Sequence, residues 1–381
     1  MAVKVCFITN YAYSLFNPKS RIVAGGIETI FYIIAKDLTP DERFEVSFLL
    51  EDDVRKNQVT EKIDGITLYK TSRQIQPKIY QDKQIEKYHR WFIYWAGKFD
   101  RLWQWPHLDF FRLWEKLKQI QADIYIHASP NYESGLINLT VRLVGKKSFY
   151  MVANDEIYYW GIKSAGVIWC LSGRHRKIIK EKYHLEAINL PCWFPRPKTT
   201  LPFKKRNYLL WVGRIEPRKH PEAFIKLAKS LPNLKFLMIV AAAPNEPDLY
   251  KTIIKTAAKI SNLQLKQDAM FTDLDRYYQT ALAFIDTSGY KNLNMTQVQA
   301  AAFKIPGLTL FKDPNDSFRQ YHWGISANGS FDRLIRNIKA ILANQNIWQT
   351  FADNAFEFAE QVYNPKSNLM SFKKQMIRLM K

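Results

Sequence analysis

The stretch LLWVGRIEPRKHPEAFIKLAKSL (residues 209–231) combines a buried strand, a short polar turn and an amphipathic helix. Its first residues are apolar without alternation, as in a parallel strand that helices cover on both faces. A second apolar strand, LKFLMIV (234–240), follows the helix directly. A strand, a crossover helix and another strand form a βαβ unit, so we predict a doubly wound α/β domain with a parallel sheet.

The same alternation also opens the chain. VKVCFIT (3–9) has the composition of a buried strand, and the apolar positions of IETIFYIIAKDL (27–38) recur at helical spacing. Between the two halves, the segment LPCWFPRPKTTLPFKKRN (190–207) is rich in proline and basic residues. Its apolar residues follow neither helical nor strand spacing, as is typical of an interdomain linker. We therefore predict a first domain over 1–195 and a second over 196–360, which leaves 361–381 for a last helix.

Composition bounds the class of protein. The chain has 381 residues, of which 47% are hydrophobic, enough for two domains with buried cores. Its three cysteines form no CxxC pair, which argues against a disulfide framework or a zinc site and fits a reducing compartment. The start does not read as a signal peptide, and no apolar run is long enough to span a bilayer. We expect a cytoplasmic protein, either soluble or peripheral on the cytoplasmic membrane face.

The formal net charge of +21 is the strongest bulk feature. It favours polyanionic partners such as anionic lipids or nucleotide diphosphates, although lysines can also simply keep a large protein soluble. Because no nucleic-acid-binding motif is recognisable, we expect no nucleic-acid partner. The segment 88–119 concentrates tryptophans among Arg and Lys and suits an anionic membrane surface. Alternatively, its rings are core or the wall of an acceptor groove.

Four features resemble the GT-B glycosyltransferases, specifically the retaining group 1 or family four type. They are AGGIE (24–28) after the first strand, the stretch 209–231, the run from ALAFIDTSGY (281–290) to AAAFKIP (300–306), and the closing helix. The resemblance covers most of the chain and is strongest over 208–307. It implies two Rossmann-like domains facing across a cleft, with the C-terminal helix packing back on the first domain. It also implies transfer of a sugar from a nucleotide sugar to a glycan or lipid-linked acceptor.

Two cations follow the strand that ends at Gly213, which the resemblance makes a donor-binding candidate. Arg214 and Lys219 lie where ligands of open α/β sheets bind, and there they could stabilise the charge of a diphosphate leaving group. The resemblance assigns them catalytic roles; the alternative is a solvated loop with local ion pairs. They could also replace a metal, and no carboxylate cluster suggests one. We expect no metal and no cofactor beyond the donor.

The resemblance implies further donor-binding residues. Gly25 and Gly26 would let the backbone approach a phosphate or sugar closely, unless they form a plain tight loop in which Glu28 caps the following helix. In the run SGYKNLNMTQVQ, a polar loop opens a helix whose first amides could hold phosphate. The donor-binding candidates in this run are Ser288, Lys291, Asn294, Met295, Thr296 and Gln299.

The run departs from the family where the family has two carboxylates, one for the donor sugar and one for the ribose. Those two places hold Lys291 and Gln299. A glutamine can still exchange hydrogen bonds with ribose hydroxyls. A lysine reverses the charge, so Lys291 indicates an acidic sugar, a contact to the diphosphate, or a site no longer used.

A second departure lies on the acceptor side. The family commonly has a histidine after the strand near 146–152, where this chain has Asn154, followed by Asp155. An amide can bond a sugar hydroxyl but cannot shuttle a proton. His127, which ends the preceding strand, is the candidate substitute; the alternative is a structural histidine with hydrogen-bonded nitrogens.

Two functions from different classes follow. The first is a retaining glycosyltransferase of the hexosyltransferase type. The second is a catalytically silent GT-B protein that serves as partner or stabiliser of an active, second glycosyltransferase. The departures at Lys291, Gln299 and Asn154 favour the second, as does AAAP (241–244) in place of a glycine-containing turn. A third alternative, a basic surface for nucleic acid, lacks a motif.

Overall fold

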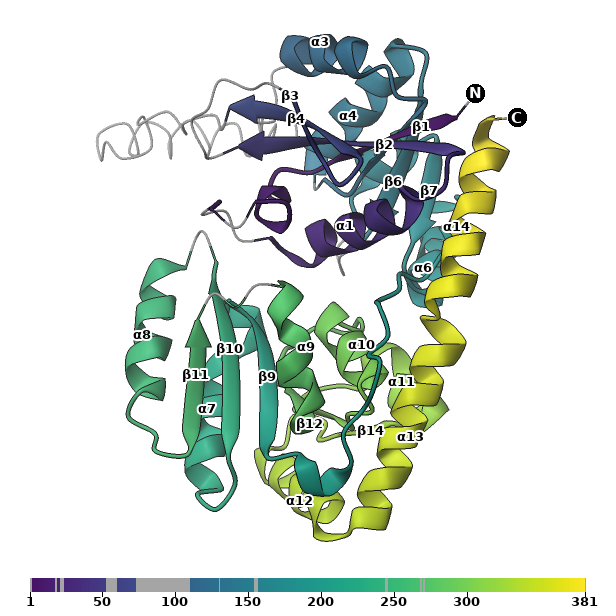
Figure 1. The fold of residues 1–381 in the computed structure, drawn as a ribbon. Helices are drawn as coiled ribbons and strands as arrows, with labels where there is room; N and C mark the ends of the chain where they lie inside the picture. Colours follow the sequence, from purple (N-terminus) through teal and green to yellow (C-terminus); the bar gives the residue numbers. More distant parts are fainter. Residues whose placement is uncertain are drawn as a thin grey trace, which may run out of the picture. The chain divides into compact units, whose positions relative to one another are not determined.

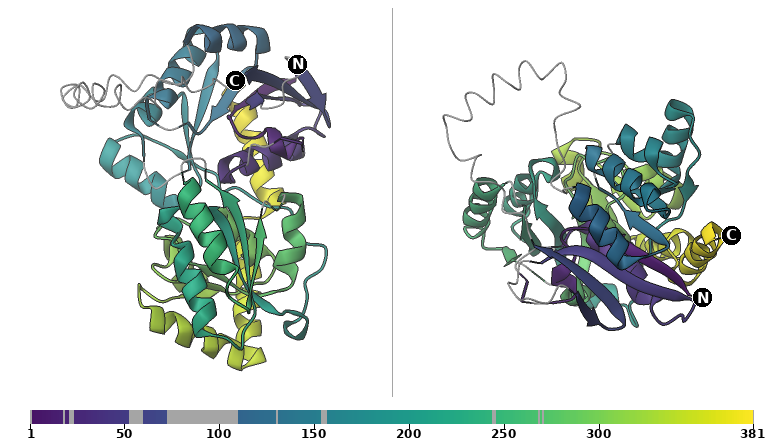
Figure 2. Two further views of the ribbon diagram at one scale, coloured as in Figure 1. Left: turned by 90° about the vertical axis from the view of Figure 1, so that its left-hand side faces the viewer. Right: turned by 90° about the horizontal axis from the view of Figure 1, so that it is seen from above.

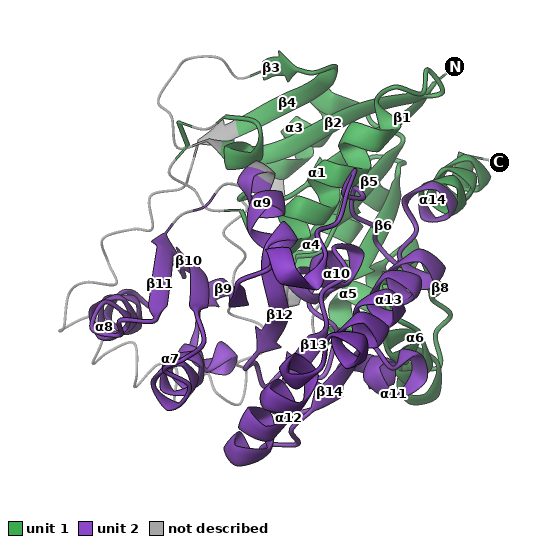
Figure 3. Ribbon diagram, turned by 60° about the horizontal axis from the view of Figure 1, so that its bottom comes forward, with its two compact units in different colours: residues 1–190, 369–381 green, residues 191–368 purple. Residues whose placement is uncertain are grey.

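The computed structural model describes residues 2–17, 19–20, 24–52, 60–72, 110–129, 131–153, 157–243, 246–267, 269 and 271–380. They form two compact units, one of residues 1–190 with 369–381 and one of 191–368 (Figure 3). The domain boundaries predicted at 195/196 and 360/361 stay a prediction. Most of the tryptophan-rich segment 88–119, together with Asn154 and Asp155, lies outside the described residues.

Unit 1 is built on a mainly parallel sheet, with strand order β3-β4-β2-β1-β5-β6-β7-β8 (Figure 1). Only the edge strand β3 runs antiparallel to its neighbour among the described strand pairs. The chain places β2 on one side of β1 and β5 on the other, which is the strand order of a doubly wound fold. The strands are β1 (Val3–Ile8), β2 (Phe44–Asp52), β3 (Thr60–Ile63), β4 (Ile66–Ser72), β5 (Ile124–His127), β6 (Lys147–Val152), β7 (Val167–Cys170) and β8 (Ile188–Asn189).

Helices cover both faces of this sheet. On one face α1 packs through Phe31 against Phe7, with ring centroids 5.1 Å apart. On the other face α3 and α4 bury Leu117 and Ile137 in a cluster with Cys6. The helical elements are η1 (Tyr13–Leu15), α1 (Gly26–Leu38), α3 (Phe110–Ile120), α4 (Asn131–Leu143), α5 (Tyr159–Ser164), α6 (Gly173–Tyr183) and α14 (Pro365–Met380).

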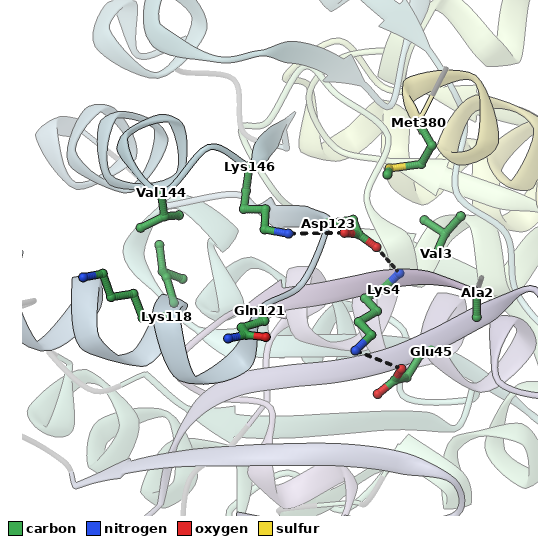
Figure 4. A pocket seen from close by; sticks show the side chains of 11 residues that line it. Ala2, Val3, Lys4, Glu45, Lys118, Gln121, Asp123, Val144, Lys146 and Met380 are labelled. Atoms are coloured by element: carbon green, nitrogen blue, oxygen red, sulfur yellow. Dashed lines mark hydrogen bonds and ion pairs between the residues drawn. The ribbon is translucent and has the colours of Figure 1, made fainter.

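As predicted, the last helix packs on unit 1. Phe372 of α14 is fully buried, and its ring lies 5.5 Å from that of Trp169. Lys373 makes an ion pair with Asp41 at 2.8 Å. The two ends of the chain therefore meet in unit 1, where Val3 and Met380 line one depression (Figures 2 and 4).

Unit 2 has a fully parallel sheet with strand order β11-β10-β9-β12-β13-β14. The chain runs outward from β9 through β10 to β11 and then returns to β12 on the other side of β9. The carboxyl ends of β9 and β12 therefore flank a topological switch point, where such sheets bind ligands. The strands are β9 (Tyr208–Ile215), β10 (Phe236–Ala242), β11 (Leu263–Gln267), β12 (Ala281–Asp286), β13 (Gly307–Thr309) and β14 (Gly324–Ser326).

The helices of unit 2 also cover both faces of its sheet. Phe224 of α7 and Leu334 of α12 pack with Trp211 on one face, whereas Tyr278 of α9 and Ala300 of α10 pack with Leu210 on the other. The helical elements are η3 (Phe203–Lys205), η4 (Pro217–Lys219), α7 (Pro221–Ser230), α8 (Pro247–Ala257), η5 (Phe271–Asp273), α9 (Leu274–Gln279), α10 (Met295–Ala302), η6 (Pro314–Asp316), α11 (Ser317–Tyr321), α12 (Phe331–Ala343) and α13 (Gln345–Val362).

Each unit thus has the predicted α/β class and a Rossmann-like parallel sheet. No helix in the described ranges is both long enough and apolar enough to cross a bilayer.

Candidate functional site

The loop after β9 places a lysine ammonium against the end of its own strand. Pro217 begins the short helix η4, and His220 in the left-handed region (φ 45°) ends it and starts α7. This turn folds the Lys219 side chain back over Gly213, where a Cβ atom would lie 2.8 Å from Lys219 Nζ. The backbone φ of Gly213 lies outside the left-handed region, so its conformation does not require a glycine. Glycine is needed here because it leaves room for the Lys219 side chain.

The Lys219 side chain is half-buried, and no group of the described residues binds its partly dehydrated ammonium. Burial lowers the pKa of Lys219, Glu216 and Asp286 oppose that effect, and Arg214 adds to it. Within the described ranges, the ammonium makes no hydrogen bond and no ion pair. A partly dehydrated cation beside a second cation is complementary to a small anion with several charges, such as a phosphate.

The loop after β12 is tied to the loop after β9. Thr287 Oγ1 accepts a hydrogen bond from Trp211 Nε1 at 3.0 Å and donates one to the carbonyl oxygen of Lys219 at 2.6 Å. Two residues on, the amide of Gly289 donates to the carbonyl oxygen of Arg218 at 2.9 Å. These bonds bring the start of the SGYKNLNM loop to the lysine.

Asp286, the last residue of β12, organises the next turn. Its Oδ1 accepts from the Ser288 amide at 2.8 Å, and its Oδ2 accepts from Asn294 Nδ2 at 3.1 Å. The same Nδ2 donates to Ser288 Oγ at 3.2 Å. Asn294 is the N-cap of α10, and its amide donates to Gln297 Oε1 at 2.8 Å. The positive end of α10 is thereby fixed at the carboxyl edge of the sheet.

The two residues at the family's carboxylate places differ in their surroundings. Gln299 is buried, and its Oε1 accepts a hydrogen bond from Tyr278 at 3.1 Å. Its Nε2 makes no hydrogen bond in the part of the chain that the structure describes. Lys291 is exposed, and its carbonyl oxygen accepts from the Asn315 amide at 3.0 Å.

The remaining donor-side candidates are spread over both units. Met295 and Thr296 are half-buried in the first turn of α10, and Met295 Sδ lies 3.4 Å from Cys192 Sγ. In unit 1, Gly25 is the N-cap of α1 in an extended conformation, followed by Gly26. The donor roles of both glycines stay predictions.

Glu28 closes the start of α1. Its Oε2 accepts from the Gly25 amide at 2.8 Å, and its Oε1 accepts from Thr9 Oγ1 at 3.0 Å. The capping role considered for Glu28 is therefore confirmed.

On the acceptor side, His127 is fully buried at the end of β5. Its Nε2 shares a hydrogen bond with Asn138 Oδ1 at 2.9 Å, and burial lowers its pKa to about 4. Since Asn138 donates its own amide hydrogens to Gly161 O and Ser164 Oγ, the oxygen accepts and Nε2 carries the proton. The buried Nδ1 has no hydrogen-bond partner among the described residues. The lack of exposed surface favours the structural alternative, although only one of the two ring nitrogens is hydrogen-bonded.

The sequence did not predict two carboxylates that lie at candidate positions in the structure. Asp286 had a weak signal, since it is the charged end of the otherwise apolar ALAFID. Glu133, in the first turn of α4, had none; burial and the neighbouring Glu51 raise its pKa to about 7. Both lie at the carboxyl edges of their sheets, where chemistry is expected.

A depression in unit 1 lies at the opposite edge of the sheet. Figure 4 shows that four of its charged residues, Lys4, Glu45, Asp123 and Lys146, interact with one another. Asp123 accepts from the Lys4 amide at 2.9 Å and from Lys146 Nζ at 3.3 Å, and Lys4 Nζ lies 3.7 Å from Glu45. These charges are satisfied by one another, so the depression is a weaker candidate than the carboxyl edge of unit 2.

Sequence comparison finds similarity to known proteins over the second unit. The family model "Glycosyl transferases group 1" matches residues 196–358, which contain the Lys219 and Asp286 cluster. The α-monoglucosyldiacylglycerol synthase of Acholeplasma laidlawii is 31% identical over 166 residues. That match spans only 40% of this chain and 40% of the relative.

Solved structures match almost the whole chain. Sucrose-phosphate synthase from Thermosynechococcus elongatus has a TM-score of 0.67 at 12% identity and covers 99% of both chains. A mutant of TarM from S. aureus, solved in a complex that includes UDP, has a TM-score of 0.69 at 11% identity over 98% of this chain and 99% of its own. At these identities the likeness is one of fold. The chain therefore has the GT-B fold, and its residues 196–358 match the model of the group 1 glycosyltransferases.

Proposed function

We propose that the chain is a retaining glycosyltransferase that moves a sugar from a nucleoside-diphosphate donor to a glycan or lipid-linked acceptor. The partly dehydrated ammonium of Lys219, which has no ion-pair partner among the described residues, is the observation that carries this proposal. It lies against Gly213, within electrostatic range of Arg214. A diphosphate needs such a site, because its negative charge grows as the glycosidic bond breaks.

Each residue then has a role. Arg214 and Lys219 neutralise the leaving diphosphate, and the loop from Ser288 to Thr296 holds phosphate and sugar with its amides and the start of α10. Gln299 holds the ribose.

In the reaction, the bond from the anomeric carbon to the phosphate oxygen breaks, and a bond from that carbon to the acceptor oxygen forms on the same face of the sugar. The acceptor proton passes to the departing phosphate, so no protein base is required. The two cations take the place of a metal.

A lipid-linked acceptor at the cytoplasmic membrane face is supported by three observations. The curated relative is named for synthesis of a glucosylated diacylglycerol. The chain carries a net charge of +21, which attracts anionic lipids. In the described end of the segment 88–119, Lys118 lies 5.1 Å from the Trp114 ring in α3. Flotation with anionic liposomes at low salt tests this part, and absence of binding would remove it.

The donor site is tested by thermal stabilisation with a panel of nucleoside diphosphates and their sugars. At a hundred times its dissociation constant, a ligand adds about 2.7 kcal/mol to the free energy of unfolding. We expect a shift with one class of nucleotide in the native protein and in the control Lys229→Ala, an exposed lysine of α7. The shift should be absent in Lys219→Ala. No shift with any nucleotide in the native protein would overturn the proposal.

The second candidate is a catalytically silent partner of an active transferase. Its specific support is the pair of non-carboxylate residues, with Lys291 exposed and the Gln299 oxygen occupied by Tyr278. This candidate predicts nucleotide binding that is weak or missing, no turnover of any donor, and co-purification with a second glycosyltransferase. Turnover by the isolated chain would exclude it.

A further inference from the structure

Both oxygens of the Asp286 carboxylate accept hydrogen bonds, and the carboxylate makes no ion pair with Lys219. One oxygen accepts from the Ser288 amide at 2.8 Å and the other from Asn294 Nδ2 at 3.1 Å. Burial raises the pKa of Asp286, while the bonds from Ser288, the charge of Lys219 and the bond from Asn294 lower it. The two hydrogen bonds therefore fix the position and the orientation of the Asp286 carboxylate.

Three charged groups act on the Lys219 ammonium. Glu216 comes from its own loop, Asp286 from the end of β12, and Arg214 from the end of β9. Neither carboxylate lies within 4.0 Å of the ammonium, the limit for an ion pair. Glu216 instead accepts from the Tyr290 hydroxyl at 3.3 Å. Both carboxylates thus act on the ammonium through space and leave its N–H donors to a ligand.

We propose that Asp286 is a positioning residue whose fixed charge keeps Lys219 protonated and available to the donor diphosphate. The proposal rests on the proposed function and adds a residue to its site. A partly dehydrated lysine beside an arginine holds its proton less tightly, and a nearby opposite charge counters this effect. A carboxylate in direct contact would compete with the phosphate for the same donors. Coulomb attraction falls with distance, so a carboxylate held farther away repels a bound phosphate less than the ammonium attracts it.

The first experiment needs no ligand. Lysines are reductively methylated with ¹³C-formaldehyde, which keeps their charge, and the pH titration of each is followed by NMR. The Lys219 signal is assigned by its loss in Lys219→Arg. We expect Asp286→Asn, which keeps an oxygen for the Ser288 amide, to lower the pKa of Lys219 by about one unit. Asp286→Glu should restore most of the native value.

Asp313→Asn is the matched control. Asp313 also accepts two backbone amides of unit 2, those of Phe318 at 2.8 Å and Arg319 at 2.9 Å. It is not among the groups that act on Lys219. If Asp286→Asn does not fold, Asp286→Ser replaces it as an uncharged acceptor. Equal titration of Lys219 in the native protein and in a folded Asp286 variant would overturn the proposal.

The second experiment measures binding of inorganic pyrophosphate by calorimetry across alkaline pH. The pH above which binding is lost should fall by about one unit in Asp286→Asn and stay unchanged in Asp313→Asn. An unchanged limit in Asp286→Asn would contradict the proposal. If pyrophosphate binds no form of the protein, the proposed function fails, while the titration of Lys219 still decides the role of Asp286.

Discussion

Gly213 and the Lys219 ammonium share one small space, since a Cβ atom on residue 213 would lie 2.8 Å from Lys219 Nζ. The other atoms within reach of that Cβ are Lys219 Cδ and Trp211 Cη2, both at 3.1 Å. The nearest obstacle is thus the end of a flexible side chain, which can move away at small cost. A side chain at 213 would therefore displace the cation rather than unfold the unit.

From this we predict the effect of Gly213→Ala. The displaced ammonium should weaken binding of inorganic pyrophosphate about tenfold, or roughly 1.4 kcal/mol, while the free energy of unfolding changes little. Calorimetric titration and urea unfolding measure the two quantities. Gly173→Ala is the control, because a Cβ there meets no atom within 4 Å. Unchanged pyrophosphate affinity in Gly213→Ala would contradict the placement of Lys219.

Local patterns in the sequence predicted the fold of each unit because they recur within short segments. VKVCFIT (3–9) and the stretch 209–231 have the periods of a buried strand and an amphipathic helix, and both form as predicted. Such patterns do not mark every boundary: within residues 330–361, α12 ends and α13 begins at Asn344. Its Oδ1 accepts from the amides of Asn346 at 2.8 Å and Ile347 at 3.4 Å, so an N-cap lies inside the periodic run.

Local sequence patterns predicted only part of the candidate site. Arg214 and Lys219 could be proposed from the sequence because a strand end followed by cations is a local signal, and their roles stay predictions. Asp286 was missed because its importance depends on the position of Lys219, 67 residues earlier in the chain. The burial of His127 was equally hidden, since it depends on how α4 and α5 pack. Contacts between distant segments set these properties, and periodicity does not report them.

Tyr278→Phe tests whether Gln299 holds the ribose. The change removes the hydroxyl that fixes the Gln299 amide and should cost about 1 kcal/mol of unfolding free energy. It should also weaken binding of the preferred nucleoside diphosphate but not of pyrophosphate, which has no ribose. Tyr208→Phe is the control, because its hydroxyl bonds Tyr277 O and Thr280 Oγ1 instead. If both variants bind the nucleotide like the native protein, Gln299 does not hold the ribose through this orientation.

Phe372→Ala tests the packing of the last helix on unit 1. Phe372 is fully buried and packs against the stacked rings of Trp169 and Phe149. Its truncation leaves a cavity and should lower the free energy of unfolding by roughly 3–5 kcal/mol. Met370→Ala on the same helix is the control, since Met370 is 69% exposed and should change it by less than about 0.5 kcal/mol. Equal small effects in urea unfolding would mean that α14 contributes little to unit 1.

The pH dependence of unit 1 should carry the signature of His127. Burial lowers its pKa from 6.5 to about 4, so the unfolded chain binds a proton that the folded chain refuses between these values. The stabilisation is complete above pH 6.5 and is lost as the pH falls toward 4, by up to about 3 kcal/mol. His127→Gln should flatten this slope relative to the native protein, and the exposed His322→Asn should not. Urea unfolding followed by hydrogen exchange in β5 measures the free energy of unfolding of unit 1 at each pH. If the slope of this free energy with pH is the same in His127→Gln, groups other than His127 cause the pH dependence.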